Sequence, residues 1–347
     1  MHRLGEGQDT FPVVRVGEIP RDESQPRWLV EGLWGPASVG FVAGHPKACK
    51  SWLGLDIAVS VATGLPCLGR FRVTEPGRAL IYLAEDSLPM VRERVAALAR
   101  HRGLALEQVD LHVITAPELR LDLAEHCVRL QATVQRLRPR LVLLDPLVRL
   151  HRLDENRSAD IAGLLSHLRA LQRAFQVAVL VVHHTRKNEV GGGPAGQGLR
   201  GSGDLWAWSD STLYIRRVKG KLRLSMEHRA AAAPDAIWLR LADEDQERLH
   251  LEVIDGEVAL EEQHSLVEAV MEALSPGAAL TRTELRDRVK VKNERLGEAL
   301  VTMEREGLLT RGPGGWRLAL TNQGSPPHLS APRNGAAQSR SDSLGGG

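Results

Sequence analysis

The chain has 347 residues, and 43% of them are hydrophobic, which is enough to bury one large core and a second, smaller one. Its charges nearly balance, with 45 Lys and Arg against 43 Asp and Glu, so a uniformly basic coat for nucleic acid is excluded and only local basic patches remain possible. The three cysteines, Cys49, Cys67 and Cys127, lie far apart and indicate neither a disulfide framework nor a zinc site. No apolar run reaches the roughly 18 residues of a membrane helix, and the N-terminus lacks the apolar stretch of a signal peptide, so we expect a cytoplasmic protein without a membrane segment.

Residues 1–33 mix Pro, Gly and charged residues and are predicted to form an irregular N-terminal arm. Short apolar runs then alternate with helical stretches, which is typical of an α/β domain with a mostly parallel sheet and helices on both faces. The predicted strands cover residues 40–44, 79–85, 111–116, 141–145 and 177–184. The predicted helices cover residues 51–62, 88–100, 121–137 and 158–175. Strands alone follow, at residues 211–217, 221–227, 236–241 and 249–254, and predict an antiparallel extension at one edge of the domain that spans 34–258.

Residues 262–320 return to a helical pattern. Three short helices followed by a Gly-Pro-Gly hairpin predict a small winged helix-turn-helix domain, whose third helix could enter a major groove of DNA. Basic residues gather on or before that helix, and Lys292 and Arg295 are candidate DNA contacts. A role in docking another protein fits this domain equally well. Residues 321–347 are rich in Ser, Pro, Gly and Ala and are predicted to be disordered.

The segment FVAGHPKACKS, residues 41–51, places a near-complete phosphate-binding loop between a strand and a helix. The pattern G-x-x-x-x-G-K-[ST] assigns Gly44 as its first glycine, Lys50 as the phosphate lysine and Ser51 as a magnesium ligand, with ATP as the nucleotide. The usual glycine before the lysine is Cys49, whose Cβ is expected to raise the cost of closing the loop by about a kcal/mol or more. A degenerate loop that has lost nucleotide binding is therefore the alternative. The predicted nucleotide-binding residues are Gly44, His45, Pro46, Lys47, Ala48, Cys49, Lys50, Ser51 and Trp52.

Two carboxylates follow predicted strands and are expected at the same sheet edge as the loop. Asp145 ends the run LVLLD and could hold a magnesium-bound water beside Ser51, although it could also simply begin an Asp-Pro turn. Glu85 follows the run ALIYLA and is our candidate for the base that deprotonates a water attacking the γ-phosphate. The alternative is that Glu85 and its neighbours Asp86 and Ser87 only cap the next helix.

His183 and His184 end the fifth predicted strand, where a polar side chain could sense the γ-phosphate. Adjacent strand residues point to opposite faces, so only one of the two is expected to face the nucleotide. The long, glycine-rich and basic loop 185–203 follows, and its residues Arg186, Lys187 and Arg200 could contact single-stranded DNA, unless the loop is only a solvated connector.

Further along the chain, Arg229 is the preferred candidate for an arginine finger that reaches a neighbouring subunit's nucleotide. Trp206 and Trp208 could stack on bases, but packing in a core or a subunit interface is the preferred interpretation.

Together these motifs resemble a RecA-like P-loop ATPase of the AAA family, similar to plasmid replicative helicases of the RepA type. The resemblance covers about residues 34–258 and rests on GHPKACKSW, IYLAEDS, LVLLDPLVRLH with the following DENRSAD, VVHHTRK, GLRGSGDLWAWSD and SMEHR. It implies a magnesium-dependent ATPase that forms a homo-oligomeric ring and acts on DNA, with Lys50, Ser51, Glu85 and Asp145 in the roles given above. The family's lysine-x-arginine finger matches only at Arg229, because Glu227 stands at the position of the lysine. The alternative function is a DNA-binding regulator in which ATP controls assembly with little or no hydrolysis.

Overall fold

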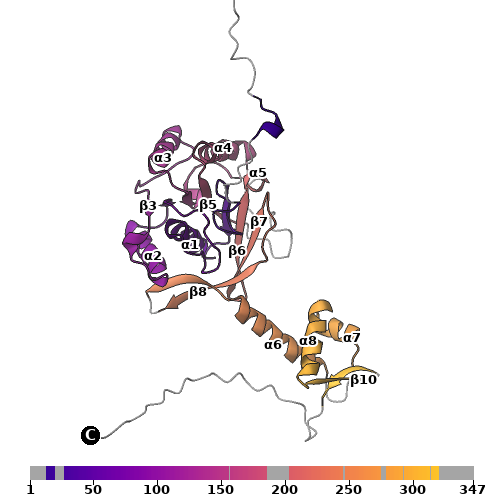
Figure 1. The fold of residues 1–347 in the computed structure, drawn as a ribbon. Coiled ribbons are helices and arrows are strands. Elements are labelled where there is room, and N and C mark those ends of the chain that lie inside the picture. Colours follow the sequence, from indigo (N-terminus) through magenta and orange to yellow (C-terminus); the bar gives the residue numbers. More distant parts are fainter. Residues whose placement is uncertain are drawn as a thin grey trace, which may run out of the picture. The chain divides into compact units, whose positions relative to one another are not determined.

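A nine-stranded sheet with the strand order β3-β2-β4-β5-β1-β6-β7-β8-β9 forms the centre of the first of two compact units, Met1–Asp255 and Gly256–Gly347 (Figure 1). This computed structural model describes residues 13–19, 27–155, 157–185, 203–244, 247–274, 279–291, 293–312 and 314–319. The predicted tail 321–347 and four candidate DNA contacts lie outside the described residues, namely Arg186, Lys187, Arg200 and Lys292. No helix among the described residues is both long and apolar enough to cross a membrane.

The strands confirm the predicted α/β class with a mostly parallel sheet and an antiparallel edge. The first five strands run in parallel and are β1 (Val39–Gly44), β2 (Ala79–Leu83), β3 (Leu111–Val113), β4 (Leu141–Asp145) and β5 (Ala178–His184). The last four are β6 (Ser211–Val218), β7 (Lys221–His228), β8 (Ile237–Glu244) and β9 (Arg248–Val253). β6 lies parallel to β1 on one side and pairs antiparallel with β7 on the other, and β7, β8 and β9 continue the antiparallel pairing. The predicted antiparallel extension is therefore confirmed for β6 to β9, and it joins the parallel part of the sheet where β6 lies beside β1.

The helices cover both faces of this sheet. They are α1 (Lys50–Thr63), α2 (Leu88–His101), α3 (Ala124–Leu137), α4 (Ser158–Phe175) and α5 (Gly203–Trp208), with short 3-10 turns at η1 (Val16–Glu18), η2 (Leu106–Gln108) and η3 (Leu147–Arg149). Side chains of α1 and α2 share one buried cluster, and those of α3 and α4 share the other. Alternate residues of β1 enter the two clusters, Val42 on the α1 face and Phe41 and Ala43 on the α4 face. Every strand in the middle of the sheet is thus buried on both sides, as its continuous apolar sequence requires.

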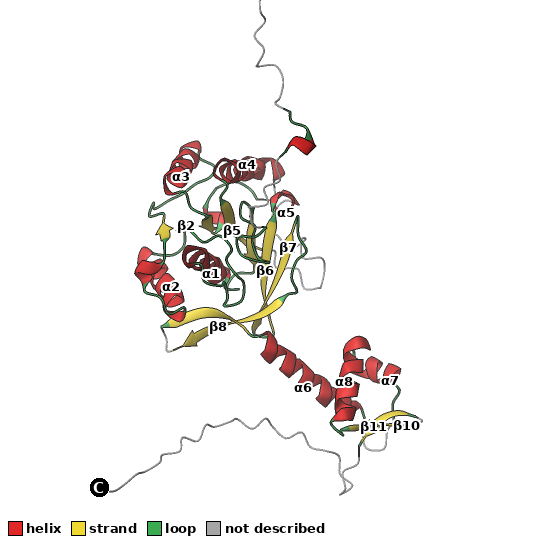
Figure 2. Ribbon diagram, viewed as in Figure 1, coloured by secondary structure: helices red, strands yellow, loops and turns green. Residues whose placement is uncertain are grey.

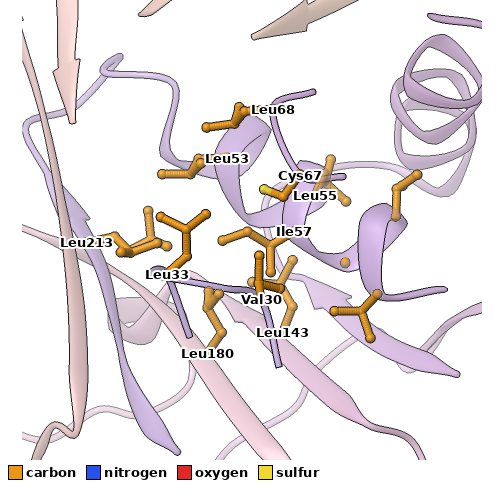
Figure 3. Packing of buried hydrophobic residues seen from close by; sticks show 14 of the residues in the cluster. Val30, Leu33, Leu53, Leu55, Ile57, Cys67, Leu68, Leu143, Leu180 and Leu213 are labelled. Carbon is orange, nitrogen blue, oxygen red and sulfur yellow. The ribbon is translucent and has the colours of Figure 1, made fainter. Parts of the chain in front are cut away.

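The cluster on the α1 face also holds the end of the predicted arm (Figure 3). Leu29, Val30 and Leu33 are fully buried there, beside Leu53 and Ile57 of α1. These three residues of the predicted arm therefore pack into the core, and burial of each such aliphatic side chain stabilises the unit by about 1.5–3 kcal/mol.

The second unit has a core of its own, built from three helices and a hairpin (Figure 2). Its elements are α6 (Asp255–Ala273), α7 (Arg282–Val289), α8 (Asn293–Arg305), β10 (Leu309–Gly312) and β11 (Gly315–Leu318). Thr281 and Glu284 form a reciprocal capping box at the start of α7. Leu280 bridges to Trp316 of the hairpin, so the chain before α7 is tied to β11. The helical pattern expected from residue 262 begins earlier, at Asp255, and whether the unit acts as a winged helix stays a prediction.

A buried ion pair joins α1 to the end of α2. The Arg102 Nη2 atom lies 2.8 Å from Asp56 Oδ2, and the two side chains are only 7% and 2% exposed. Arg102 also donates to the Ser60 hydroxyl at 3.2 Å and to the Leu98 carbonyl at 3.1 Å. The other Asp56 oxygen accepts the Leu68 N–H at 2.8 Å. These contacts hold α1, whose first residues carry the phosphate-loop lysine and serine, against its neighbours.

We expect Arg102→Met to lower the free energy of unfolding by about 3–5 kcal/mol, because it leaves the buried Asp56 carboxylate without its counter-charge. Arg92→Met is the matched control, since Arg92 pairs with Glu93 only at the exposed surface, and we expect a loss below about 0.5 kcal/mol. Urea denaturation of the two variants measures both values. Equal losses in the two variants would contradict a structural role for the buried pair.

Candidate nucleotide-binding site

Side-chain alternation in the parallel strands brings the predicted polar residues to the α1 face of the sheet. Leu143 on β4 and Val182 on β5 belong to the α1 cluster, so Asp145 and His184, two residues further on, emerge on that same face. Leu83 on β2 places Glu85 there by the same rule. Because these strands are parallel, their carboxyl ends meet at the edge where α1 begins. Residues from three strands thus surround the N-terminus of α1.

The phosphate loop turns through two residues with left-handed backbone. Lys47 has φ 63° and Cys49 has φ 62°, and Cys49 is the residue immediately before α1. Since a Cβ in this region costs roughly 1–2 kcal/mol, the loop keeps the shape that a glycine would adopt while carrying the strain of a cysteine. The predicted cost of Cys49 therefore has a structural basis in its φ angle.

The first amide groups of α1 point into the loop without partners. Among the described residues, the N–H groups of Lys50, Ser51 and Trp52 donate no backbone hydrogen bond, and the first such bond in the helix runs from Leu53 to the Cys49 carbonyl at 3.1 Å. A helix start with free N–H groups carries a partial positive charge and attracts an anion. This is the geometry that a nucleotide phosphate requires.

Gly44 is needed at the start of the loop for the packing of the sheet as well. A Cβ on Gly44 would lie 2.2 Å from the Ile215 carbonyl oxygen of β6, which is too close for any other residue. Its carbonyl also accepts the Thr185 N–H at 3.2 Å, just beyond β5. The first glycine of the motif therefore fixes where the loop leaves the sheet.

Lys50 is buried within the loop, and its ammonium donates to the His45 carbonyl at 2.8 Å. Burial lowers the pKa of Lys50, while the nearby carboxylates of Asp145 and Glu85 raise it in part. The charged ammonium thus lies in a poorly hydrated place, where an added phosphate would supply the counter-charge that water cannot.

Asp145 is buried beside Ser51, whose hydroxyl hydrogen-bonds to the carboxylate. The pKa of Asp145 is raised to about 6, chiefly by burial, with the negative charges of Asp86 and Glu85 acting in the same direction and Ser51 and Lys50 opposing the shift. A hydroxyl and a carboxylate that touch each other are oxygen ligands of the kind that Mg²⁺ prefers. Ser51 and Asp145 therefore fit the predicted metal site, directly or through water.

Glu85 is half exposed and forms an ion pair with Arg149, whose Nε lies 2.7 Å from Glu85 Oε1. Its charge affects the pKa values of Lys50, Asp145 and His184, which places it close to all three. The side chain of Ser87, and not that of Glu85, caps α2 by accepting the Met90 N–H. Glu85 is thus left available to the site.

A second charged pair lies next to Glu85. Asp86 pairs with Arg94, whose guanidinium lies 5.6 Å from the centre of the Trp52 ring. Trp52, on the first turn of α1, is thereby tied to α2. Neither Arg149 nor Arg94 was predicted from the sequence as part of the site, because an arginine carries no motif and its partner is set only by the folded chain.

The two histidines at the end of β5 face opposite ways, as predicted. His183 is buried on the α4 face, with its ring 5.7 Å from that of Phe41. His184 is half-buried on the α1 face, where burial, Lys50 and His183 lower its pKa. The buried Nδ1 atom of His184 has no hydrogen-bond partner among the described residues. His184 is therefore the better placed of the two as a γ-phosphate sensor, a role that stays a prediction.

Arg229 lies apart from these residues. It follows β7, pairs with Asp210 at 3.4 Å, and donates to the Ala207 carbonyl. Because β6 is parallel to β1 and Ser211 pairs with Gly40, this is the sheet edge opposite the phosphate loop. Arg229 cannot reach the loop of its own chain, so a finger role requires a second subunit and stays a prediction.

Arg217, at the other end of β6, does approach the loop. Its guanidinium donates to the Lys47 carbonyl at 3.4 Å. Burial raises the pKa of the Cys49 thiol, and the charges of Arg217 and Lys50 oppose that shift. With a raised pKa the thiol stays neutral near pH 7, so Cys49 adds no negative charge beside a bound phosphate.

The predicted candidate Arg295 lies on α8, and its side chain is outside the described part of the chain. Trp208 is packed inside as predicted, with its ring 5.4 Å from that of Phe41. Trp206 is 52% exposed, so of the two predicted surroundings it is not in the core of its own chain, and a place in a subunit interface stays a prediction. The sequence motif LWAWSD gave no sign of the difference, because the last turn of α5 decides which indole faces inward.

The loop, the lysine and the carboxylate at the end of β4 define this protein as a P-loop nucleotide-binding protein with an α/β core. The family model described as "AAA domain" matches residues 8–190, which is more than half of the chain. The chain therefore belongs to the AAA domain family. Among solved structures, a crystal structure of the RadB recombinase is similar, with 18% sequence identity and a TM-score of 0.47 over 63% of this chain and 91% of that chain. A search of curated proteins found no match.

We expect Cys49→Gly to raise the free energy of unfolding by about 0.5–1 kcal/mol, because relief of the left-handed strain exceeds the entropy that a glycine adds to the unfolded chain. Cys127→Gly is the matched control, since Cys127 lies within α3, where a glycine costs about 1 kcal/mol. Chemical denaturation of both variants shows whether each substitution raises or lowers the free energy of unfolding. A loss of stability in Cys49→Gly equal to that in Cys127→Gly would contradict strain at the loop.

Asp145 predicts a pH dependence of stability. Its pKa of about 6 in the folded chain lies above the ordinary 3.8, so the folded protein holds this proton more tightly than the unfolded chain. The free energy of unfolding should therefore fall by up to about 3 kcal/mol through this group as the pH rises from about 4 to about 6. Denaturation at several pH values gives the free energy of unfolding as a function of pH. For Asp145→Asn this free energy should fall less over that range than in wild type, or rise. Parallel profiles for wild type and Asp145→Asn, with exposed Asp235→Asn as control, would contradict the raised pKa.

Proposed function

We propose that this protein is a RecA-like ATPase that binds and hydrolyses MgATP at the loop before α1 and acts on DNA, as a replicative helicase or helicase loader of a plasmid or mobile element. The observation that carries the proposal is the meeting of Lys50, the Ser51–Asp145 pair and Glu85 around unpaired N–H groups of α1. Each lies on the α1 face at the carboxyl edge of the parallel sheet, where α/β proteins bind ligands. Membership of the AAA domain family supports the same conclusion.

In this proposal Lys50 and the N–H groups of α1 bind the phosphates, and burial makes their charge effective because little water competes. Ser51 and Asp145 would hold Mg²⁺, which neutralises phosphate charge when it is bound. Glu85 orients an attacking water and takes its proton, and the ion pair with Arg149 holds the carboxylate in place. His184 senses the γ-phosphate from the next strand.

The DNA part of the proposal is supported by the order of the motifs that resemble RepA-type helicases and by basic residues of the second unit. Arg286, Arg288 and Lys290 lie on α7 or at its end, next to the helix that would serve as the recognition helix of a winged helix domain. Assembly into a ring would bring Arg229 of one subunit towards the phosphate loop of the next, as the finger role requires.

A nucleotide-gated DNA-binding regulator is the second candidate function. Two observations favour it. Cys49 holds the loop in a strained shape, and Glu227 occupies the position of the lysine in the lysine-x-arginine finger. Glu227 accepts hydrogen bonds from Trp206 and Tyr214, so it has a role in the local structure. The positive charge that the family's lysine would place at this position is missing. In this function ATP binds and changes assembly, and turnover is slow.

Steady-state hydrolysis of MgATP by the full chain, with and without single-stranded DNA, tests the proposal. We expect turnover that rises with DNA and falls about 10²-fold or more in Lys50→Ala, because this variant removes the buried positive charge on the phosphates. Lys219→Ala, in an exposed turn, is the matched control and should retain wild-type turnover. DNA-independent ATP binding without turnover would favour the regulator. Turnover that survives in Lys50→Ala would contradict both functions.

Glu85→Gln separates hydrolysis from binding. A glutamine keeps the size of the side chain but cannot accept the proton, so we expect turnover to fall about 10²–10⁴-fold while ATP affinity is retained. Equilibrium binding of a fluorescent ATP analogue gives the affinity beside the rate. If Glu85→Gln loses binding and turnover together, Glu85 is not the base.

A further inference from the structure

Trp206 on α5 is exposed and yet held in a fixed orientation. Its Nε1 donates to Glu227 Oε2 at 3.2 Å, and the same oxygen accepts the Tyr214 hydroxyl at 3.1 Å. Glu227 belongs to β7 and Tyr214 to β6, and α5 lies beside these strands in Figure 1. The half-exposed indole is therefore fixed against the sheet, and a fixed aromatic ring loses little conformational entropy when a partner stacks on it.

Trp206 forms one wall of a hollow of about 410 Å³. The hollow lies where β6 begins and β7 ends, at the sheet edge opposite the phosphate loop of the same chain, so within one chain it is separate from the site described above. Its volume is within the range of small-molecule sites, about 300–1,000 Å³. Its polar lining is formed by Ser209, Asp210, Thr212, Glu227, His228 and Arg229.

The carboxylates of Asp210 and Glu227 at the hollow are matched by two guanidinium groups, Arg229 in its lining and Arg169 behind it. Asp210 is paired with Arg169 at 2.5 Å and with Arg229 at 3.4 Å. Glu227 accepts from two neutral donors, and burial lowers the pKa of His228, which stays neutral near pH 7. A hollow with no strong excess of one charge does not select a highly charged ligand. A flat aromatic wall beside hydroxyl and carboxylate oxygens suits a planar, uncharged ring that carries N–H donors.

We propose that Trp206 is the stacking platform of a nucleobase-binding site, with Glu227 as the positioning residue that holds the indole. A nucleobase has the required flat ring and N–H groups, and stacking on an aromatic side chain tolerates any base. This inference rests on the proposed function. That function names two ligands that carry a nucleobase, single-stranded DNA and ATP. The protein would then have two ligand sites on opposite edges of the sheet, the phosphate loop at one edge and this base-binding site at the other.

Two binding measurements on the full chain test this site. The first uses the anisotropy of a fluorescein-labelled oligothymidylate, and the second uses calorimetry with a non-hydrolysable ATP analogue to count nucleotides per chain. We expect Trp206→Ala to weaken the affinity for the oligonucleotide about ten-fold. Trp206→Phe should retain most of the affinity, because a smaller ring still stacks. The slope of log affinity against log salt should stay unchanged, since no phosphate contact is lost. Leu241→Ala, an exposed apolar residue on β8, is the control.

If Trp206→Ala weakens the affinity for the oligonucleotide, the site binds single-stranded DNA. Loss of a second nucleotide per chain, with oligonucleotide binding unchanged, assigns it to free ATP. The proposal is overturned if Trp206→Ala changes neither measurement, or if light scattering shows that the variant changes the oligomeric state, which would make Trp206 a contact between copies. Failure here is distinct from failure of the proposed function, because turnover without DNA depends on Lys50 and should be the same in Trp206→Ala and wild type.

Discussion

The chain must turn from β1 into α1 within five residues and leave the first amide groups of the helix unpaired, and the rest of the nucleotide site depends on this turn. The left-handed backbone at Lys47 and Cys49 makes the turn possible. Gly44, the last residue of β1, lets the backbone pass close to Ile215 of β6 where the loop begins, and the Asp56–Arg102 pair holds the helix that follows. The direction of the N–H groups is thus set by contacts on both sides of the loop. A cysteine is tolerated before Lys50 because these contacts over-determine its strained conformation.

The same turn brings together charges that the folded chain alone does not satisfy. Burial disfavours both the ammonium of Lys50 and the carboxylate of Asp145, as the opposite shifts of their pKa values show. Their direct hydrogen-bond partners are neutral groups, the His45 carbonyl for Lys50 and the Ser51 hydroxyl for Asp145. A phosphate and a divalent cation would satisfy both at once. The cost of burying these groups is therefore understandable as preparation for a ligand of that chemistry.

The sequence predicted the parts of this molecule that follow from local pattern. Continuous apolar runs predicted the five parallel strands, and the glycine, lysine and serine of the loop predicted where α1 begins. Alternation along strands predicted that one histidine would face the site, and the structure selects His184. Features decided by contacts between distant segments could not be predicted. They include the parallel pairing of β6 with β1, the burial of Leu29 and Val30 and the different surroundings of Trp206 and Trp208. The same holds for Arg149, because its partner Glu85 lies 64 residues away along the chain.

Hydrogen exchange can show whether the amide groups at the start of α1 bind the phosphates of ATP. Exchange of the peptide covering residues 45–53 would be measured with and without MgATP, in wild type and in Lys50→Ala. We expect MgATP to slow exchange in this peptide in wild type, because the unpaired N–H groups of Lys50, Ser51 and Trp52 gain acceptors, and we expect Lys50→Ala largely to abolish the effect. ATP that binds while exchange in this peptide stays unchanged would contradict this expectation.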